Sequence, residues 1–146
     1  MERLGRTREV VLDMLRNKNI TIYNIRKTGD SRTYVRNVFY CHYEENIGGF
    51  HEKTDNRKQN VATILIPLSV QHETGKTYVL PQQFSTASGN VFTLKEDDIV
   101  IPYECSEEII SEREFAKKHP ELLRIASVET CDYGSYYQQH WEVTCG

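Results

Sequence analysis

Short segments rich in β-branched residues, separated by turns and not by regularly spaced helices, are the feature of this sequence that most restricts its fold. The clearest of them are residues 20–23, 33–43, 61–68, 99–101, 122–130 and 141–144. Parallel α/β sheets need a crossover, usually a helix, between successive strands, so this arrangement favours antiparallel pairing. We therefore expect a mainly β fold, a small antiparallel β-barrel or sandwich.

Two of these segments are predicted to form core strands. In residues 33–43 the side chains alternate between two faces, which places Val35, Phe39, Cys41 and Tyr43 on the same face. Residues 61–68 are the most apolar run in the chain. A proline at position 67 limits this run to an edge or an end of the sheet, because proline cannot donate to the ladder. Two weaker strands are expected within residues 76–80 and 91–94.

Two short helices are expected beside the strands. Residues 7–16 carry apolar side chains at one-turn spacing, and Thr7 can cap the first turn. Ser111 and Glu114 have the spacing of a capping box, which predicts a helix over residues 112–118.

Length and charge restrict the organisation further. A chain of 146 residues fits a single domain, here with an extended loop at residues 44–60 and a helical insertion at residues 103–120. The formal net charge of -3 excludes the strong positive field of a non-specific nucleic-acid binder, so any DNA contact would be local. No stretch approaches the roughly 20 apolar residues that cross a bilayer, and the N-terminus is too charged for a signal peptide. We expect synthesis in the cytosol and no membrane partner.

The four cysteines, Cys41, Cys105, Cys131 and Cys145, are widely spaced and form no C-x-x-C pair. In a reducing compartment this pattern favours buried free thiols over disulfides or metal ligands.

The sequence contains no motif that predicts a catalytic residue, a metal ligand or a cofactor. A nucleophile elbow is absent, and the Gly48–Gly49 pair lacks the spacing of a phosphate-binding loop. The enzymatic alternative is a metal-dependent hydrolase that uses Asp97 and Asp98 with Lys95, because clustered acids can hold magnesium.

Aromatic residues crowd the end of the chain at Tyr133, Tyr136, Tyr137 and Trp141. Tyrosine and tryptophan give large contact areas with a polar end, which suits interfaces, yet tryptophan is also highly buried in monomers. This group is therefore either a structural anchor or an interface.

The loop at residues 44–60 has a Gly-Gly pair, nearly balanced charges and almost no apolar residues. Such a segment cannot bury enough surface to order itself, so we expect a partner to order it. The residues expected to contact that partner are Ile47, Gly48, Gly49, Phe50, Lys53, Arg57 and Lys58.

Three stretches together carry a resemblance to a known family: residues 20–24, residues 64–67, and a closing pattern in residues 127–143. The most distinctive part of that pattern is Asp132-Tyr133-Gly134-Ser135 followed by His140-Trp141-Glu142-Val143. Nearly the whole chain resembles a family of small proteins from phages and prophages of Gram-positive bacteria, which are encoded among virion assembly genes.

The resemblance implies a place at the head–tail neck of the virion, as a head-closure (stopper) or related connector protein. Proteins of that class are small β-barrels that assemble as rings around the DNA channel, with a long loop inside the ring. Residues 44–60 occupy the corresponding position, whereas the insertion at residues 103–120 is longer than the family pattern. The implied partners are further copies in a cyclic ring, the portal or adaptor and tail proteins, and packaged DNA through non-specific contact. A host-directed binding protein of the same phage is a third interpretation.

Overall fold

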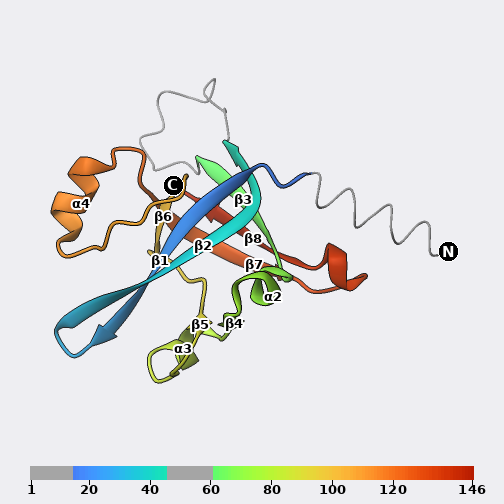
Figure 1. The fold of residues 1–146 in the computed structure, drawn as a ribbon, viewed down its shortest axis with the longest axis horizontal. Coiled ribbons are helices and arrows are strands. Elements are labelled where there is room, and N and C mark those ends of the chain that lie inside the picture. Colours follow the sequence, from blue (N-terminus) through green and yellow to red (C-terminus); the bar gives the residue numbers. More distant parts are fainter. Residues whose placement is uncertain (1–14, 46–60) are drawn as a thin grey trace.

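The computed structural model describes residues 15–45 and 61–146, and its centre is a closed six-stranded barrel (Figure 1). The strands follow one another around the barrel in the order β1 (Lys18–Thr28), β2 (Ser31–Glu45), β3 (Ala62–Pro67), β8 (His140–Cys145), β7 (Leu123–Cys131) and β6 (Ile99–Ile101). All neighbours in the barrel are antiparallel. The prediction of a mainly β fold, a small antiparallel barrel or sandwich, is confirmed, and the structure is the barrel.

The longest feature is the β1–β2 hairpin, whose two strands pair continuously from Lys18 opposite Cys41 to Thr28 opposite Ser31. Gly29 has a φ of +63° in the two-residue turn, a conformation that glycine adopts without steric cost. The tip of the hairpin projects at the lower left of Figure 1. The hairpin therefore extends one side of the barrel well beyond its core.

Both predicted core strands are confirmed as β2 and β3. Phe39, Cys41 and Tyr43 are buried as expected, whereas Val35 is only partly buried. Asn37, on the same face, is buried instead, which the hydrophobic pattern did not predict. Pro67 is the last residue of β3, at an end and not at an edge, because closure of the barrel leaves β3 with a partner on either side.

Two hydrophobic clusters lie on the two sides of β1. The interior cluster contains Ile20, Ile22, Phe39, Phe92 and Trp141 among others. A second cluster forms between the barrel wall and the insertion that follows β6; its members are Tyr23, Ile99, Ile101, Cys105, Ile109 and Phe115. The insertion at residues 103–120 is thus packed against the barrel wall and covers its outer surface.

Helix α4 (Glu112–Lys118) has the predicted bounds, and its cap is present, because the backbone N–H of Glu114 donates to the hydroxyl of Ser111 at 3.4 Å. Three short helical segments were not predicted: α2 (Val70–Thr74), α3 (Pro81–Phe84) and the 3₁₀ segment η1 (Tyr136–Gln138). The expected helix at residues 7–16 lies outside the described residues except for its last two positions. No helix in the described ranges is both long and apolar enough to cross a membrane.

The two weaker strand predictions correspond to β4 (Thr77–Tyr78) and β5 (Val91–Phe92). They pair with each other in parallel and form a separate two-stranded sheet outside the barrel. Together with α3 they form a lobe below the barrel in Figure 1. This lobe and the β1–β2 hairpin form two walls of the cleft described below.

Candidate functional site

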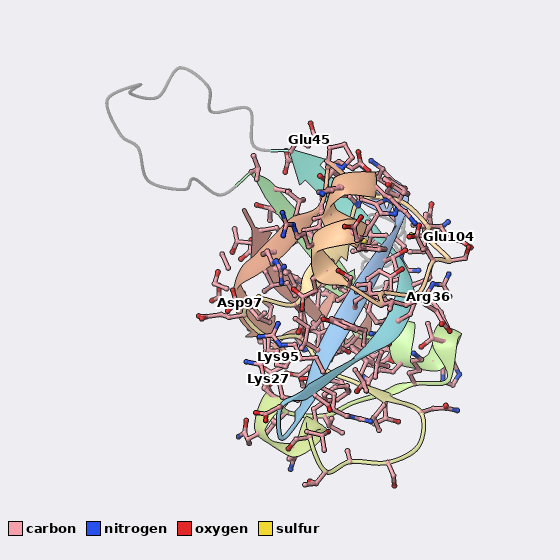
Figure 2. All side chains as sticks on the ribbon, turned by 90° about the vertical axis from the view of Figure 1, so that its left-hand side faces the viewer. Lys27, Arg36, Glu45, Lys95, Asp97 and Glu104 are labelled. Carbon is pink, nitrogen blue, oxygen red and sulfur yellow. The ribbon has the colours of Figure 1, made fainter. Side chains whose placement is uncertain are left out.

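The loop predicted to contact a partner lies largely outside the described residues. This applies to all seven residues assigned to that contact: Ile47, Gly48, Gly49, Phe50, Lys53, Arg57 and Lys58. The segment connects β2 to β3, which pair with each other as far as Glu45 opposite Ala62. Glu45 is labelled at the upper end of the barrel in Figure 2. The prediction for this loop stays a prediction.

The structure separates the aromatic group at the end of the chain into a core residue and surface residues. Trp141 is 2% exposed, and its ring centroid lies 4.8 Å from that of Tyr78 and 5.7 Å from that of Phe92. Tyr133 is 75% exposed and Tyr136 is 48% exposed. Of the two interpretations left open, Trp141 therefore fits the anchor, and the two tyrosines are available for an interface. Tyr137 lies in η1.

Asp98, the central residue of the hydrolase alternative, is fully buried. Its carboxylate accepts hydrogen bonds from the backbone N–H of Ile25 at 3.1 Å and from the side chain of Asn24 at 2.8 Å, and it pairs with Lys95. Burial raises the pKa of Asp98, although these three partners oppose the rise. The carboxylate thus holds the start of β6 against β1, whereas the neighbouring Asp97 is exposed.

A cysteine and a histidine from the two ends of the insertion at residues 103–120 meet beside α4. The Cys105 sulfur lies 3.9 Å from Nε2 of His119, and the same nitrogen lies 3.2 Å from a carboxylate oxygen of Glu107. A carboxylate only accepts, so Nε2 must carry the proton that it donates to Glu107. That nitrogen cannot then take a proton from the thiol. These contacts therefore hold the two ends of the insertion at residues 103–120 together.

All four cysteines are buried, as predicted, and each is a free thiol in this structure. Within residues 15–45 and 61–146, no three His, Cys, Asp or Glu side chains gather in a group that could hold a metal ion.

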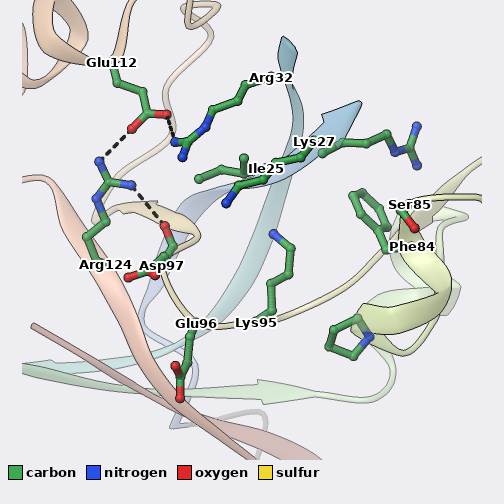
Figure 3. Close-up of a pocket in the computed structure, with 12 residues that line it drawn as sticks. Ile25, Lys27, Arg32, Phe84, Ser85, Lys95, Glu96, Asp97, Glu112 and Arg124 are labelled. Carbon is green, nitrogen blue, oxygen red and sulfur yellow. Dashed lines mark hydrogen bonds and ion pairs between the residues drawn. The ribbon is translucent and has the colours of Figure 1, made fainter. Parts of the chain in front are cut away.

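A cleft of about 490 Å³ opens between the tip region of the β1–β2 hairpin, α3 and the turn before β6 (Figure 3). It is lined by Ile25, Arg26, Lys27, Arg32, Pro81, Phe84, Ser85, Lys95, Glu96, Asp97, Glu112 and Arg124. Five of these residues are basic and three are acidic, in a chain whose net charge is -3. No sequence pattern indicated this cleft, because its lining comes from six separate stretches of the chain.

One wall of the cleft is fixed by ion pairs around Glu112. Its carboxylate accepts from Arg32 at 2.8 Å and from Arg124 at 2.9 Å, and also from the hydroxyl of Tyr34. Burial alone would raise the pKa of Glu112, but these hydrogen bonds outweigh burial and lower the pKa to about 2. Arg124 also donates to the backbone carbonyl of Asp97 at 3.1 Å. Glu112 thereby links the hairpin, α4 and β7.

The described residues expose large apolar side chains at several places: Leu15, Tyr40, Val61, Leu80, Ile110, Tyr133 and Tyr136. Two of these places differ in chemistry and are called patches below. The first is Ile110, which is 93% exposed at the start of α4 beside a groove lined by Glu107, Glu108, Ser111, Glu114, Phe115 and Lys118. The second is the pair Tyr133 and Tyr136 around η1. The long axis of the molecule is horizontal in Figure 1, with α4 towards its left end and the red η1 segment towards its right end. The two patches therefore lie at opposite ends of the described structure.

Comparisons with known proteins give one match. A family model described as a family of unknown function (DUF6751) matches residues 15–146. Neither the curated proteins nor the solved structures contain a match to this chain.

Proposed function

This chain belongs to the DUF6751 family, and we propose that it is a structural subunit of the head–tail junction of a tailed phage, where it forms a ring that joins or seals the DNA-filled head and the tail. The place at the neck is supported by the resemblance of residues 20–24, 64–67 and 127–143 to virion assembly proteins. The protein acts by binding its neighbours.

The observation that carries the ring is the pair of dissimilar apolar patches at opposite ends of the molecule. A cyclic ring needs heterologous contacts, in which one patch of each subunit meets a different patch of the next. Ile110 at one end and Tyr133 with Tyr136 at the other provide such a pair. Tyrosine is enriched at protein interfaces, and its ring gives an apolar surface against which an aliphatic side chain can pack.

The contact is expected to be weak for an isolated pair of subunits. Complete burial of one isoleucine side chain contributes only about 1.5–3 kcal/mol, and association costs several kcal/mol in translational and rotational freedom. Assembly should therefore be favoured on a preformed ring of the portal or adaptor protein, which holds successive subunits in place.

Two complementary variants test the ring. Ile110→Asp removes the first patch, and the double variant Tyr133→Ser, Tyr136→Ser removes the second. The parent protein at high concentration should give oligomers larger than dimers in native mass spectrometry, and each variant alone should stay monomeric. A mixture of the two variants should form only one-to-one dimers, because a single intact pair of patches remains. Ile110→Val is the matched control and should behave as the parent.

Assembly of both variants into rings as readily as the parent would contradict these contacts. The place in the virion is tested separately, by immunogold labelling of phage particles that carry the gene. Label at the neck is expected, and label confined to the host cell or the tail tip would overturn the assignment. A gene position between the portal and tail-tube genes is the matching genetic observation.

A further inference from the structure

Both ring nitrogens of His119, at the end of α4, have hydrogen-bonding partners. Nε2 lies 3.2 Å from a carboxylate oxygen of Glu107, and Nδ1 lies 2.5 Å from the hydroxyl oxygen of Tyr103. That hydroxyl is also hydrogen-bonded to the carboxylate of Glu121, which lies 3.8 Å from Nδ1. The side chain of His119 is only 12% exposed, so water has little access to it. These contacts join the beginning of the insertion at residues 103–120 to its end.

The contacts of Tyr103 and His119 can all form together only if the imidazole carries two protons. Burial and the hydrogen bond to Glu121 raise the pKa of Tyr103 to about 12, so the hydroxyl keeps its single proton. A carboxylate only accepts, so this proton goes to Glu121, and Nε2 of His119 donates to Glu107. Nδ1 must then donate a proton of its own to the Tyr103 oxygen, because two acceptors at 2.5 Å would repel each other. An imidazole binds a proton more tightly than a carboxylic acid does, which places the extra proton on His119 and not on Glu121.

The charges around the ring favour this imidazolium form. The carboxylates of Glu107 and Glu121 face its two nitrogens, and the hydrogen bond from His119 lowers the pKa of Glu107. Apart from Tyr103, the other charged or titratable side chains with a contact at this site are Cys105, whose sulfur lies 3.9 Å from Nε2; Lys118, which binds Glu107; Tyr23 of β1, which binds Cys105; and Arg36 of β2, which binds the Cys105 carbonyl. The two cations contact partners of the ring, whereas the two carboxylates contact the ring itself.

We infer that His119 is a pH-sensitive switch for the insertion. With two ring protons it holds the ends of residues 103–120 together, and without the Nδ1 proton the Tyr103 hydroxyl can serve only one of its two partners. An imidazole changes charge between about pH 5 and 8, whereas carboxyl groups are ionised across this range. The protonated form completes the network, so its stabilisation is present at the acid side of this range and is lost as the pH rises.

The switch also affects the surface that carries Ile110. This residue lies within the insertion and is 93% exposed, so its position depends on how residues 103–120 are held. If the ring forms as proposed above, oligomers should be favoured at pH 6 over pH 8.5. This consequence rests on the proposed function, whereas the switch itself does not.

Hydrogen exchange of the full chain, followed by NMR at pH 6 and pH 8.5, tests the switch. The amides of Phe115, His119 and Leu122 are hydrogen-bonded within the insertion or next to it, and they report on its opening. After correction for the intrinsic exchange rate, their protection should fall by roughly fivefold at the higher pH, the factor that loss of one hydrogen bond gives. The barrel amides of Ile64 and Val143 should keep their protection. The ring ¹⁵N signals of His119 should change from two protonated nitrogens to one over the same interval.

Two variants and a control assign the effect to the network. His119→Gln and Tyr103→Phe each remove one partner, and the fall in protection between pH 6 and pH 8.5 should disappear in both. His72→Gln is the matched control, because it removes an exposed histidine of α2 and should keep the full pH effect. A single ring proton on His119 at pH 6, unchanged protection in the parent, an equal fall in the barrel, or a pH effect that persists in His119→Gln would each overturn the inference. A fall in protection without any change in oligomers would support the switch and contradict the contact through Ile110.

Discussion

Asn37 of β2 donates its side-chain N–H to the side-chain oxygen of Asn24 of β1 at 2.9 Å, and both residues are buried in the barrel wall. The Asn24 oxygen also accepts from the backbone N–H of Thr93, and its amide donates to Asp98. Lys76 closes the network through a hydrogen bond to the Asn37 oxygen at 2.7 Å. These contacts connect the hairpin with the residue before β4, the residue after β5 and the residue before β6.

Replacement of Asn24 should therefore be costly. Asn24→Ala leaves the Thr93 N–H, the Asn37 amide and the Asp98 carboxylate each without one partner. A buried polar group left unsatisfied costs about 1–3 kcal/mol, so the free energy of unfolding should fall by about 3 kcal/mol or more. Urea denaturation at pH 7 measures this. Asn90→Ala, in an exposed loop, should change the value by less than about 0.5 kcal/mol; equal effects of the two substitutions would show that the network contributes nothing.

Trp141 should act through packing. Trp141→Ala should lower the free energy of unfolding by about 3–5 kcal/mol, enough to leave a small domain largely unfolded or insoluble. Trp141→Phe should cost much less, because it keeps a ring against Tyr78 and Phe92 and removes an indole N–H that is buried without an acceptor in the described residues. Thermal denaturation followed by circular dichroism compares the two. A stable Trp141→Ala protein that only fails to bind a neighbour would instead place Trp141 at an interface.

Glu112 should make the protein sensitive to acid. The pKa of this carboxyl group is about 2 in the folded chain, below its ordinary value of 4.5, so its contribution to stability is complete above 4.5. That contribution is lost as the pH falls from 4.5 towards 2. Glu112→Gln should be less stable than the parent at pH 7, and the difference should shrink towards pH 2. Urea denaturation at several pH values checks this, and a difference that is constant with pH would refute it.

The mainly β fold could be predicted from the sequence because its strand segments are rich in β-branched residues and bounded by turns, although the pattern did not decide between a barrel and a sandwich. Helix α4 was predictable to the residue, since Ser111 and Glu114 provide a capping pattern whose first hydrogen bond forms. Helices α2 and α3, of five and four residues, are too short to show a helical period. Pro81, which follows the strand expected within residues 76–80, is the first residue of α3, where its missing N–H costs nothing.

The polar interior and the cleft could not be predicted in the same way. Asn24 and Asn37 occupy strand positions where a hydrophobic pattern assigns polar residues to the surface. They can be buried only because residues from other segments satisfy their hydrogen bonds. Asp98 ends a run of four charged residues, which a hydrophobic pattern likewise assigns to the surface, yet it is fully buried. The cleft joins residues as distant as Ile25 and Arg124, which no local pattern relates.

The cysteines should be unreactive in the folded protein. The thiolate is the reacting form, and burial raises the pKa of Cys41 and of Cys145 to about 12, so little thiolate exists at pH 8. We expect very slow reaction of the native chain with a thiol reagent such as DTNB, and release of four equivalents after denaturation in urea. A Ser135→Cys variant adds an exposed thiol and should react at once with one equivalent. Rapid reaction of the parent protein would contradict the burial of its cysteines.

The barrel should fold without most of the loop that connects β2 to β3. Deletion of residues 47–58 leaves Asn46, Gln59, Asn60 and Val61 between the two strands, a connection of a length common in hairpins. The strands stay paired through Tyr43 opposite Ile64 and Glu45 opposite Ala62. Because a shorter loop loses less entropy on closure, the deleted chain should fold and be more stable by about 1 kcal/mol in urea denaturation.

If the loop lines the DNA channel as the resemblance implies, phage particles with the deleted chain should lose packaged DNA or fail to join tails. A second variant, in which residues 47–58 are replaced by Gly-Ser repeats of the same length, tests whether side chains such as Phe50 matter or only the length. Loss of DNA in both variants would assign the role to the loop's own side chains, and loss in the deletion alone would assign it to length. Sealed heads and normal titres in both would contradict a channel role, because the barrel alone would then suffice to close the head.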